Sequence, residues 1–200
     1  MENATGVPTL VGNDTNAALV AERFFGDCSP NSMLISIGRG VGAALCLNDV
    51  IIEGSSSTAG EIAHVVVDPN GPTCECGKRG CLESLVSDDR LQERIAQNPA
   101  SRTRILAEAG ALLGRVMAIP AGLLDLRDIS IYGAPEIVNA QFIDAMEDEI
   151  RRTMTTDYQK APQIHRCRQG EDLTLRGQAT IVIRTLVPTI HERGSLIGDA

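Results

Sequence analysis

The residues most capable of chemistry are three cysteines in the run CECGKRGC at positions 74–81. The two glycines of this run permit the chain reversals that bring three thiols together. Structural zinc takes four ligands in a tetrahedron, commonly three Cys and one His. His64 is the natural fourth ligand, because the other two histidines, His165 and His191, lie far along the chain. The sequence therefore predicts one zinc ion bound by His64, Cys74, Cys76 and Cys81.

The same four residues have a plainer interpretation, as three reduced buried cysteines and an ordinary histidine with a hydrogen-bond partner. Four possible ligands with turn glycines between them are typical of a metal site, and zinc is the interpretation that we favour. Four protein ligands leave no open position for water. The zinc is therefore expected to be structural and not a hydrolytic centre.

Charge and composition weigh against several other kinds of function. The 200 residues carry 18 Lys and Arg against 26 Asp and Glu, with no long basic run, so this chain is not expected to bind nucleic acid by itself. No apolar stretch is expected to reach the roughly 20 residues of a membrane span, and the N-terminus lacks the pattern of a signal peptide. The sequence predicts a cytoplasmic globular protein with no membrane partner.

Short apolar strands alternate with longer helical segments, a pattern that predicts an α/β architecture. Residues 32–37 and 43–47 are expected to form a β-hairpin around the turn 38–42, and residues 128–132 a buried strand. Weaker strand signals cover residues 9–12, 61–68 and 164–168. Helices are predicted over residues 17–25, 83–97, 101–124 with a kink or break at Pro120, 136–157 with Pro135 in its first turn, and 175–190.

This arrangement would place Asp14 where a strand leads into a helix, a position at which carboxylates and ligands are often presented. Asn13 and Asp14 could instead simply cap the helix, because both side chains accept hydrogen bonds from free backbone N–H groups. The residues alone leave both possibilities open.

Further motifs follow one another along the chain. They are GNDTNA at 12–17, GRGVGAA at 38–44, EIAH at 61–64, CECGKRGCLE at 74–83 and YGAP at 132–135. Together they resemble the ROK family, the bacterial group of sugar kinases and sugar-responsive transcriptional repressors. The cysteine signature is the most specific of them, and the resemblance extends from Asn13 to about Gly177.

The resemblance implies an actin-like, ribonuclease-H-like fold with sugar bound in a cleft between two lobes. It also implies that Asn13, Asp14, Glu61, His64 and Glu83 contact the sugar. These residue types suit that role, because each sugar hydroxyl both donates and accepts hydrogen bonds, and short carboxylates and amides pair with adjacent hydroxyls. The cysteine knuckle, residues 73–82, would then position Glu83, while His64 could offer one ring nitrogen to zinc and the other to the sugar.

The chain departs from the family pattern in two respects. It contains neither the Asp-x-Gly-x-Thr loop of the kinases nor the winged helix-turn-helix of the repressors, so residues 1–200 resemble the C-terminal part of a longer protein. In the family's phosphate loop, here Gly38, Arg39, Gly40, Val41 and Gly42, the arginine stands where kinases usually have threonine. A long cation would crowd the close backbone approach of a nucleotide, which weighs against ATP as a ligand.

We favour the interpretation that residues 1–200 are the effector-binding and oligomerising portion of a ROK-type regulator, in the repressor branch of the family. The expected effector is a monosaccharide or a phosphorylated or amino sugar, held weakly by this chain alone. DNA would be bound only through an upstream domain. A homodimer or homotetramer is expected from the resemblance and from the apolar helix 104–124, although that helix could equally be buried all round.

Two alternatives remain. The chain could be the C-terminal half of a ROK sugar kinase, in which Asp14 would be the catalytic base that deprotonates a sugar hydroxyl for attack on the γ-phosphate. It could also be a zinc-stabilised interaction module without a small ligand. The presence of Asp14 separates these possibilities only weakly, because the same residue can bind sugar in a protein that is not an enzyme.

Overall fold

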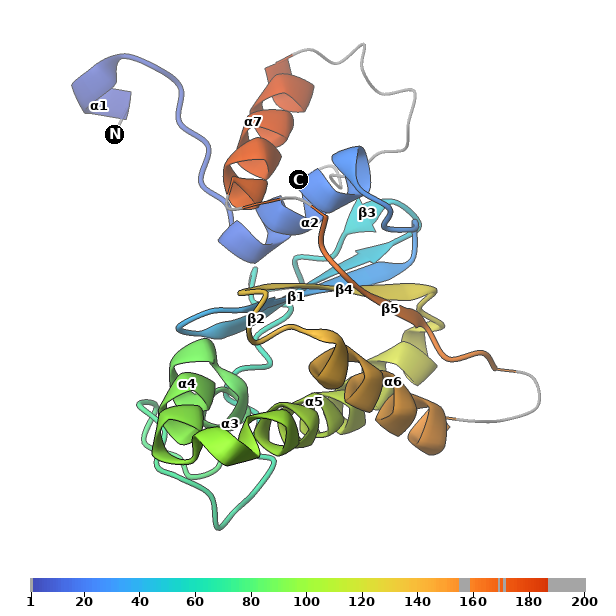
Figure 1. Cartoon of the computed structure of the whole chain (residues 1–200). Coiled ribbons are helices and arrows are strands. Elements are labelled where there is room, and N and C mark those ends of the chain that lie inside the picture. The colour runs from blue at the N-terminus through green and yellow to red at the C-terminus, as the bar shows by residue number, and fades with distance from the viewer. Residues whose placement is uncertain (1, 155–158, 169, 171, 187–200) are drawn as a thin grey trace.

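A mixed five-stranded sheet in the order β3-β2-β1-β4-β5 forms the centre of the molecule (Figure 1). The computed structural model describes residues 2–154, 159–168, 170 and 172–186. The strands are β1 (Ser32–Ile37), β2 (Val41–Leu47), β3 (Val50–Ile51), β4 (Asp128–Gly133) and β5 (Gln163–Arg166). β1 and β2 form the predicted antiparallel hairpin, whereas β4 and β5 extend the sheet in parallel, so the predicted α/β architecture is confirmed.

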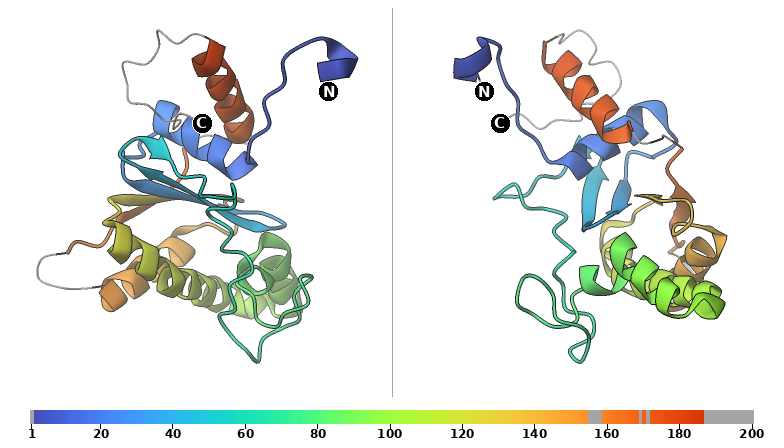
Figure 2. Two further views of the ribbon diagram at one scale, coloured as in Figure 1. Left: turned by 180° about the vertical axis from the view of Figure 1, so that it is seen from behind. Right: turned by 60° about the vertical axis from the view of Figure 1, so that its left-hand side comes forward.

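Helices cover both faces of this sheet, as Figures 1 and 2 show from three directions. α2 (Asp14–Phe25) and α7 (Leu173–Leu186) lie on one face. The other face carries α3 (Glu83–Val86), α4 (Asp88–Gln97), α5 (Arg102–Leu124) and α6 (Ala140–Met154). The short α1 (Glu2–Thr5) lies away from the sheet, and a 3-10 turn, η1 (Pro99–Ser101), precedes α5.

Side chains along the strands point alternately to the two faces of the sheet, so the core forms two layers. In β1, Met33, Ile35 and Ile37 belong to the larger apolar cluster on the α5 and α6 side. Leu34 points the other way and joins the smaller cluster with residues of α2. Because side chains alternate faces with a period of two, a strand buried on both faces reads as the nearly continuous apolar run SMLISI.

α5 and α6 pack at close range because glycines stand at their contact. A Cβ atom on Gly110 would lie 2.1 Å from the carbonyl oxygen of Phe142, and one on Gly114 would lie 2.6 Å from that of Met146. By length and composition alone, the helical stretch Pro99–Leu124 is long and apolar enough to cross a membrane. Half of its apolar window is buried within this fold.

Several predicted boundaries were wrong for local reasons. Residues 9–12 and 61–68 are not strands; in the second range only Val66 makes a β-bridge, to Cys81. The predicted helix 83–97 is divided at Ser87, and α5 continues through Pro120 without a break. α6 begins at residue 140 and not 136, since Pro135 lies in a turn and Asn139 accepts a hydrogen bond from the N–H of Phe142. Positions 155–157 and 187–190 of the predicted helices lie outside the described residues.

Candidate functional site

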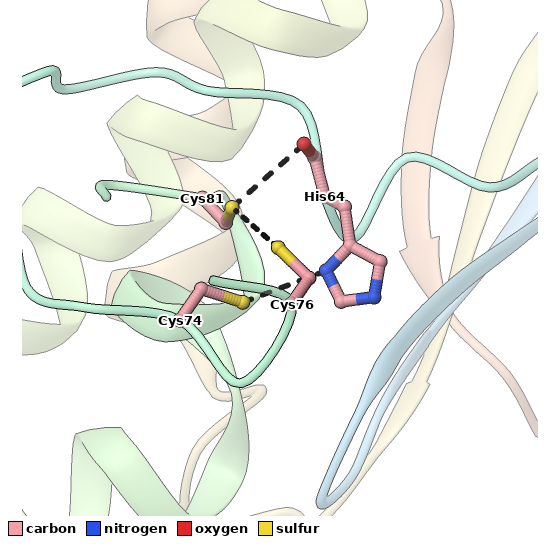
Figure 3. A group of neighbouring side chains, drawn as sticks. All are labelled: His64, Cys74, Cys76 and Cys81. Carbon is pink, nitrogen blue, oxygen red and sulfur yellow. Dashed lines mark hydrogen bonds between the residues drawn. The ribbon is translucent and has the colours of Figure 1, made fainter. Parts of the chain in front are cut away.

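The four predicted metal ligands converge in the cysteine knuckle (Figure 3). His64 Nδ1 lies 3.5 Å from the Sγ atom of Cys74, and the Sγ atoms of Cys76 and Cys81 lie 3.6 Å apart. The four possible ligand atoms all lie within 4.8 Å of one another. In a tetrahedral site with Zn–S near 2.3 Å and Zn–N near 2.0 Å, sulfur–sulfur and sulfur–nitrogen separations would be roughly 3.8 and 3.5 Å. The observed spacing therefore fits a single zinc-sized ion.

Turn chemistry explains why this short run closes on itself. The backbone N–H of Gly77 donates to the carbonyl of Cys74, and the N–H of Cys74 donates to the carbonyl of Lys78. Gly77 and Gly80 both have positive φ, at 86° and 66°. A Cβ on Gly80 would lie 1.5 Å from the carbonyl oxygen of Asp68, so only glycine fits there.

The thiols differ in their electrostatic surroundings. A hydrogen bond from the backbone N–H of Lys78 lowers the pKa of Cys76, whose sulfur lies at the exposed side of the knuckle. Burial raises the pKa of Cys81 to about 11. In the absence of a cation a buried thiol of this kind stays neutral, whereas metal binding requires the thiolate.

A cavity of about 420 Å³ adjoins the knuckle and reaches the start of α2 and the turn between β1 and β2. All five residues that the resemblance assigns to sugar line it: Asn13, Asp14, Glu61, His64 and Glu83. The loop residues Gly38, Arg39, Gly40 and Gly42 line it too. His64 thus borders both the knuckle and the cavity, with its second ring nitrogen directed away from the sulfurs (Figure 3).

At the start of α2, Asn13 performs the capping role that the sequence left open. Its side-chain oxygen accepts hydrogen bonds from the N–H groups of Thr15 and Asn16, at 2.8 and 3.0 Å. Only its amide NH₂ is left to face a ligand. Asp14 is exposed in the first turn of the helix, where a carboxylate is favoured by the helix dipole. No strand precedes it, so that part of the prediction was wrong.

Glu83 connects the knuckle to the hairpin turn. It is half-buried at the start of α3, and its Oε2 accepts a hydrogen bond from the N–H of Val41 at 3.1 Å. Arg39 is exposed at the tip of that turn and lines a second cavity of about 280 Å³ as well, which also includes Glu83.

Two residues of the cavity wall, Ser36 and Gly60, lie outside every motif that the sequence indicated. Gly60 has a φ of 91°, and a Cβ there would lie 1.9 Å from the carbonyl oxygen of Ala43. It lets the segment before Glu61 lie directly against β2. A glycine immediately before the EIAH motif was the one available signal for this close approach.

The amino-acid sequence is similar to those of known proteins. The sequence matches the model of the ROK family over residues 1–185. A glucokinase of Halalkalibacterium halodurans is 42% identical over 90 residues, which are 44% of this chain and 27% of the kinase. The DNA-binding transcriptional dual regulator NagC of Escherichia coli K12 is 36% identical over 98 residues, which are 48% of this chain and 24% of NagC.

Among solved structures, a ROK family transcriptional regulator that is a homologue of E. coli MLC superposes with a TM-score of 0.79 at 26% identity. The match covers 90% of this chain and 53% of the regulator. The chain therefore spans about half the length of that regulator, and its matches to the two curated relatives span about a quarter of theirs. Regulators and kinases both occur among these relatives, and the match over residues 1–185 shows that the chain belongs to the ROK family.

Proposed function

We propose that this chain binds a sugar effector in the 420 Å³ cavity and forms the effector-binding, self-associating part of a ROK-type transcriptional regulator. One observation carries the proposal. Residues from three separate parts of the chain, Asn13 with Asp14, Glu61 with His64, and Glu83, line one cavity. Three carboxylates, an amide and an imidazole around one space form a donor and acceptor set suited to a ring of adjacent hydroxyls.

The proposed role of the cysteine knuckle is structural. When bound there, zinc would link His64 to the three thiols, with no open position for a reacting water. Cys81 lies two residues before Glu83, and His64 lines the same cavity as Glu83. The knuckle would thus hold two sugar-binding side chains at a set separation.

Arg39 supports a regulator over an enzyme. Its side chain is exposed at the β1–β2 turn and borders both the sugar cavity and the adjoining 280 Å³ cavity. A guanidinium at this tip obstructs the close backbone approach to phosphates that glycine-rich loops provide. DNA binding of the whole regulator is proposed by analogy with NagC and would come from outside the described lobe.

A sugar kinase is the second candidate, and Asp14 is the observation that favours it. Its carboxylate is exposed on the cavity wall, where it could accept a proton from a sugar hydroxyl in transfer to a nucleotide phosphate. The glucokinase relative supports the same possibility.

Calorimetry of the 200-residue chain against a panel of monosaccharides, amino sugars and sugar phosphates tests the proposal. Four of the five side chains are exposed, so water competes for their hydrogen bonds to the sugar. We therefore expect a dissociation constant of about 1 mM, which is a binding free energy of about −4 kcal/mol, for the preferred sugar. Asp14→Asn and Glu61→Gln should each weaken binding about tenfold. Asp144→Asn, an exposed carboxylate on α6 outside the cavity, should leave it unchanged.

Undiminished affinity in both cavity variants would remove the sugar-site assignment. Incubation with ATP, Mg²⁺ and the same panel separates the two candidates. No sugar-dependent hydrolysis is expected. Turnover above blank that disappears in Asp14→Asn would place the kinase first.

A further inference from the structure

A second group of possible metal ligands lies on the opposite side of the sheet from the knuckle. Glu22 comes from α2, Cys28 from the connection between α2 and β1, and His165 from β5. One ligand atom from each lies within 4.8 Å of the others. The three residues are far apart in sequence, and no sequence motif links them.

Glu22 and Cys28 are buried and His165 is half-buried, and Glu22 and His165 have buried polar atoms without hydrogen-bond partners. Glu22 is 0% exposed, and neither of its carboxylate oxygens has a hydrogen-bond partner among the described residues. His165 Nε2 is also buried and lacks one. Cys28 is buried, with its Sγ 3.1 Å from the hydroxyl of Ser130. An unpaired buried carboxylate is costly, so the arrangement calls for a missing partner.

The neighbouring cations are already engaged elsewhere. Arg23 pairs with Asp49, and Arg168 pairs with Asp27 at 2.8 Å. Burial raises the pKa of Glu22, an effect that His165 and the backbone N–H groups of Arg168 and Asp27 partly offset, although neither N–H meets the carboxylate with hydrogen-bond geometry. Burial also raises the pKa of Cys28, to about 12. Proton uptake alone would neutralise Glu22, yet its new O–H would still need an acceptor.

We propose that Glu22, Cys28 and His165 bind a second zinc ion. Thiolate, imidazole and carboxylate are the three ligand types that zinc accepts in proteins. Two positive charges would balance one carboxylate and one thiolate, which makes the buried site neutral overall. His165 also lines a cavity of about 420 Å³, and a water molecule from this side would complete the four ligands.

The position of this site indicates what it would do. It would join the end of α2 to β5, an edge strand of four residues held on one side by β4. α2 begins with Asp14 on the proposed sugar cavity, so the ion would also stabilise the helix that presents this carboxylate. This site does not depend on the proposed function, because neither the knuckle nor the sugar residues contribute a ligand.

Zinc counted per chain tests the proposal, on the 200-residue protein equilibrated with excess Zn²⁺ and then desalted. With the knuckle occupied as well, about two ions per chain are expected. Cys28→Ser should bind about one, and so should Cys76→Ser, because serine is a poor zinc ligand at either site. Cys46→Ser is the matched control: Cys46 is equally buried in the same apolar cluster but is not part of the ligand group, so about two ions should remain.

Glu22→Gln is a second, nearly isosteric variant. It tests the same zinc site if Cys28→Ser fails to fold. It should also retain about one ion. With Co²⁺ in place of Zn²⁺, the thiolate charge-transfer band should weaken in Cys28→Ser and persist in Cys46→Ser. Wild-type protein with a single ion that Cys76→Ser removes would overturn the proposal, and so would an undiminished count in both Cys28→Ser and Glu22→Gln.

Discussion

The Glu83 carboxylate accepts a hydrogen bond from the backbone N–H of Val41 at 3.1 Å and so joins the start of α3 to the hairpin turn. Glu83 comes two residues after Cys81, and Val41 comes two residues after Arg39. The side chain proposed to bind sugar therefore also helps to hold the arginine-bearing turn, together with the hydrogen bond from the N–H of Asp88 to the carbonyl of Gly38. A ligand that competes for this carboxylate would disturb the turn.

Glu83→Ala is expected to lower the free energy of unfolding by about 1–2 kcal/mol, because it removes a charged acceptor from a half-buried N–H. Glu83→Gln keeps an acceptor oxygen and should recover most of that loss. Urea denaturation of the three proteins measures the difference. Zinc content should stay the same throughout, since Glu83 is not a member of the knuckle ligand group. Loss of zinc in Glu83→Ala would show instead that this residue acts through the knuckle.

Cys76→Ser is expected to remove zinc from the knuckle and to destabilise residues 61–83, because metal binding there is coupled to closure of the loop. A chelator should do the same to wild-type protein. Metal analysis and amide hydrogen exchange over this segment would check both effects. Normal protection of the segment in metal-free protein would show that its backbone hydrogen bonds suffice without zinc.

Two glycines of α5 offer a paired test of the packing against α6. Gly110→Ala should destabilise the protein by about 2 kcal/mol or more, since its Cβ would lie 2.1 Å from the Phe142 carbonyl oxygen. Gly122→Ala should stabilise it by about 0.5–1 kcal/mol, because the nearest atom is a flexible Met154 methyl at 3.6 Å and alanine favours helix. Thermal unfolding of both variants decides whether close helix approach or helix propensity dominates.

Local sequence signals predicted the elements that carry strong periodicity. The run SMLISI, the glycine-rich turn and the strand DISIY lie where expected, because a strand buried on both faces leaves an apolar run that is hard to mistake. The knuckle was predictable because its cysteines are close in sequence and turn glycines separate them.

The parts that could not be predicted depend on tertiary contacts. Residues 61–68 read as a strand by composition, yet their backbone groups bond to Gly80 and Leu82 and form no ladder. Glu22, Cys28 and His165 carry no local pattern, since helix packing and sheet order bring them together. Glu149 pairs with Arg152 on its own helix, but its second partner, Arg115, is brought to it only by the contact of α5 with α6.

Glu149 should make stability depend on pH in the acid range. Hydrogen bonds from Arg152 and Arg115 lower its pKa from 4.5 to about 2. A lowered pKa in the folded state stabilises the protein above the ordinary value, and this contribution is lost as the pH falls from about 5 to about 2. Glu149→Gln should therefore lower the free energy of unfolding at pH 7. The loss should be limited to about 1–2 kcal/mol, because both arginines are exposed and solvent screens the ion pairs. Urea denaturation at several pH values should show the difference vanish near pH 2.

Self-association is expected through the C-terminal end of α5. Ile119 and Leu123 lie one turn apart on this helix and are 71% and 80% exposed, although the opposite side of α5 is buried against α6. Apolar side chains adjacent on an exposed helix face indicate a surface that a second copy can cover.

The double variant Ile119→Lys, Leu123→Lys should sediment as a monomer at concentrations on the order of tens of micromolar, where wild type forms dimers or larger species. Leu175→Lys on α7, which removes a comparably exposed apolar side chain from the other helical layer, should leave association intact. Dissociation by Leu175→Lys alone would move the interface to α7, and a monomeric wild-type chain would show that the two α5 side chains simply face solvent.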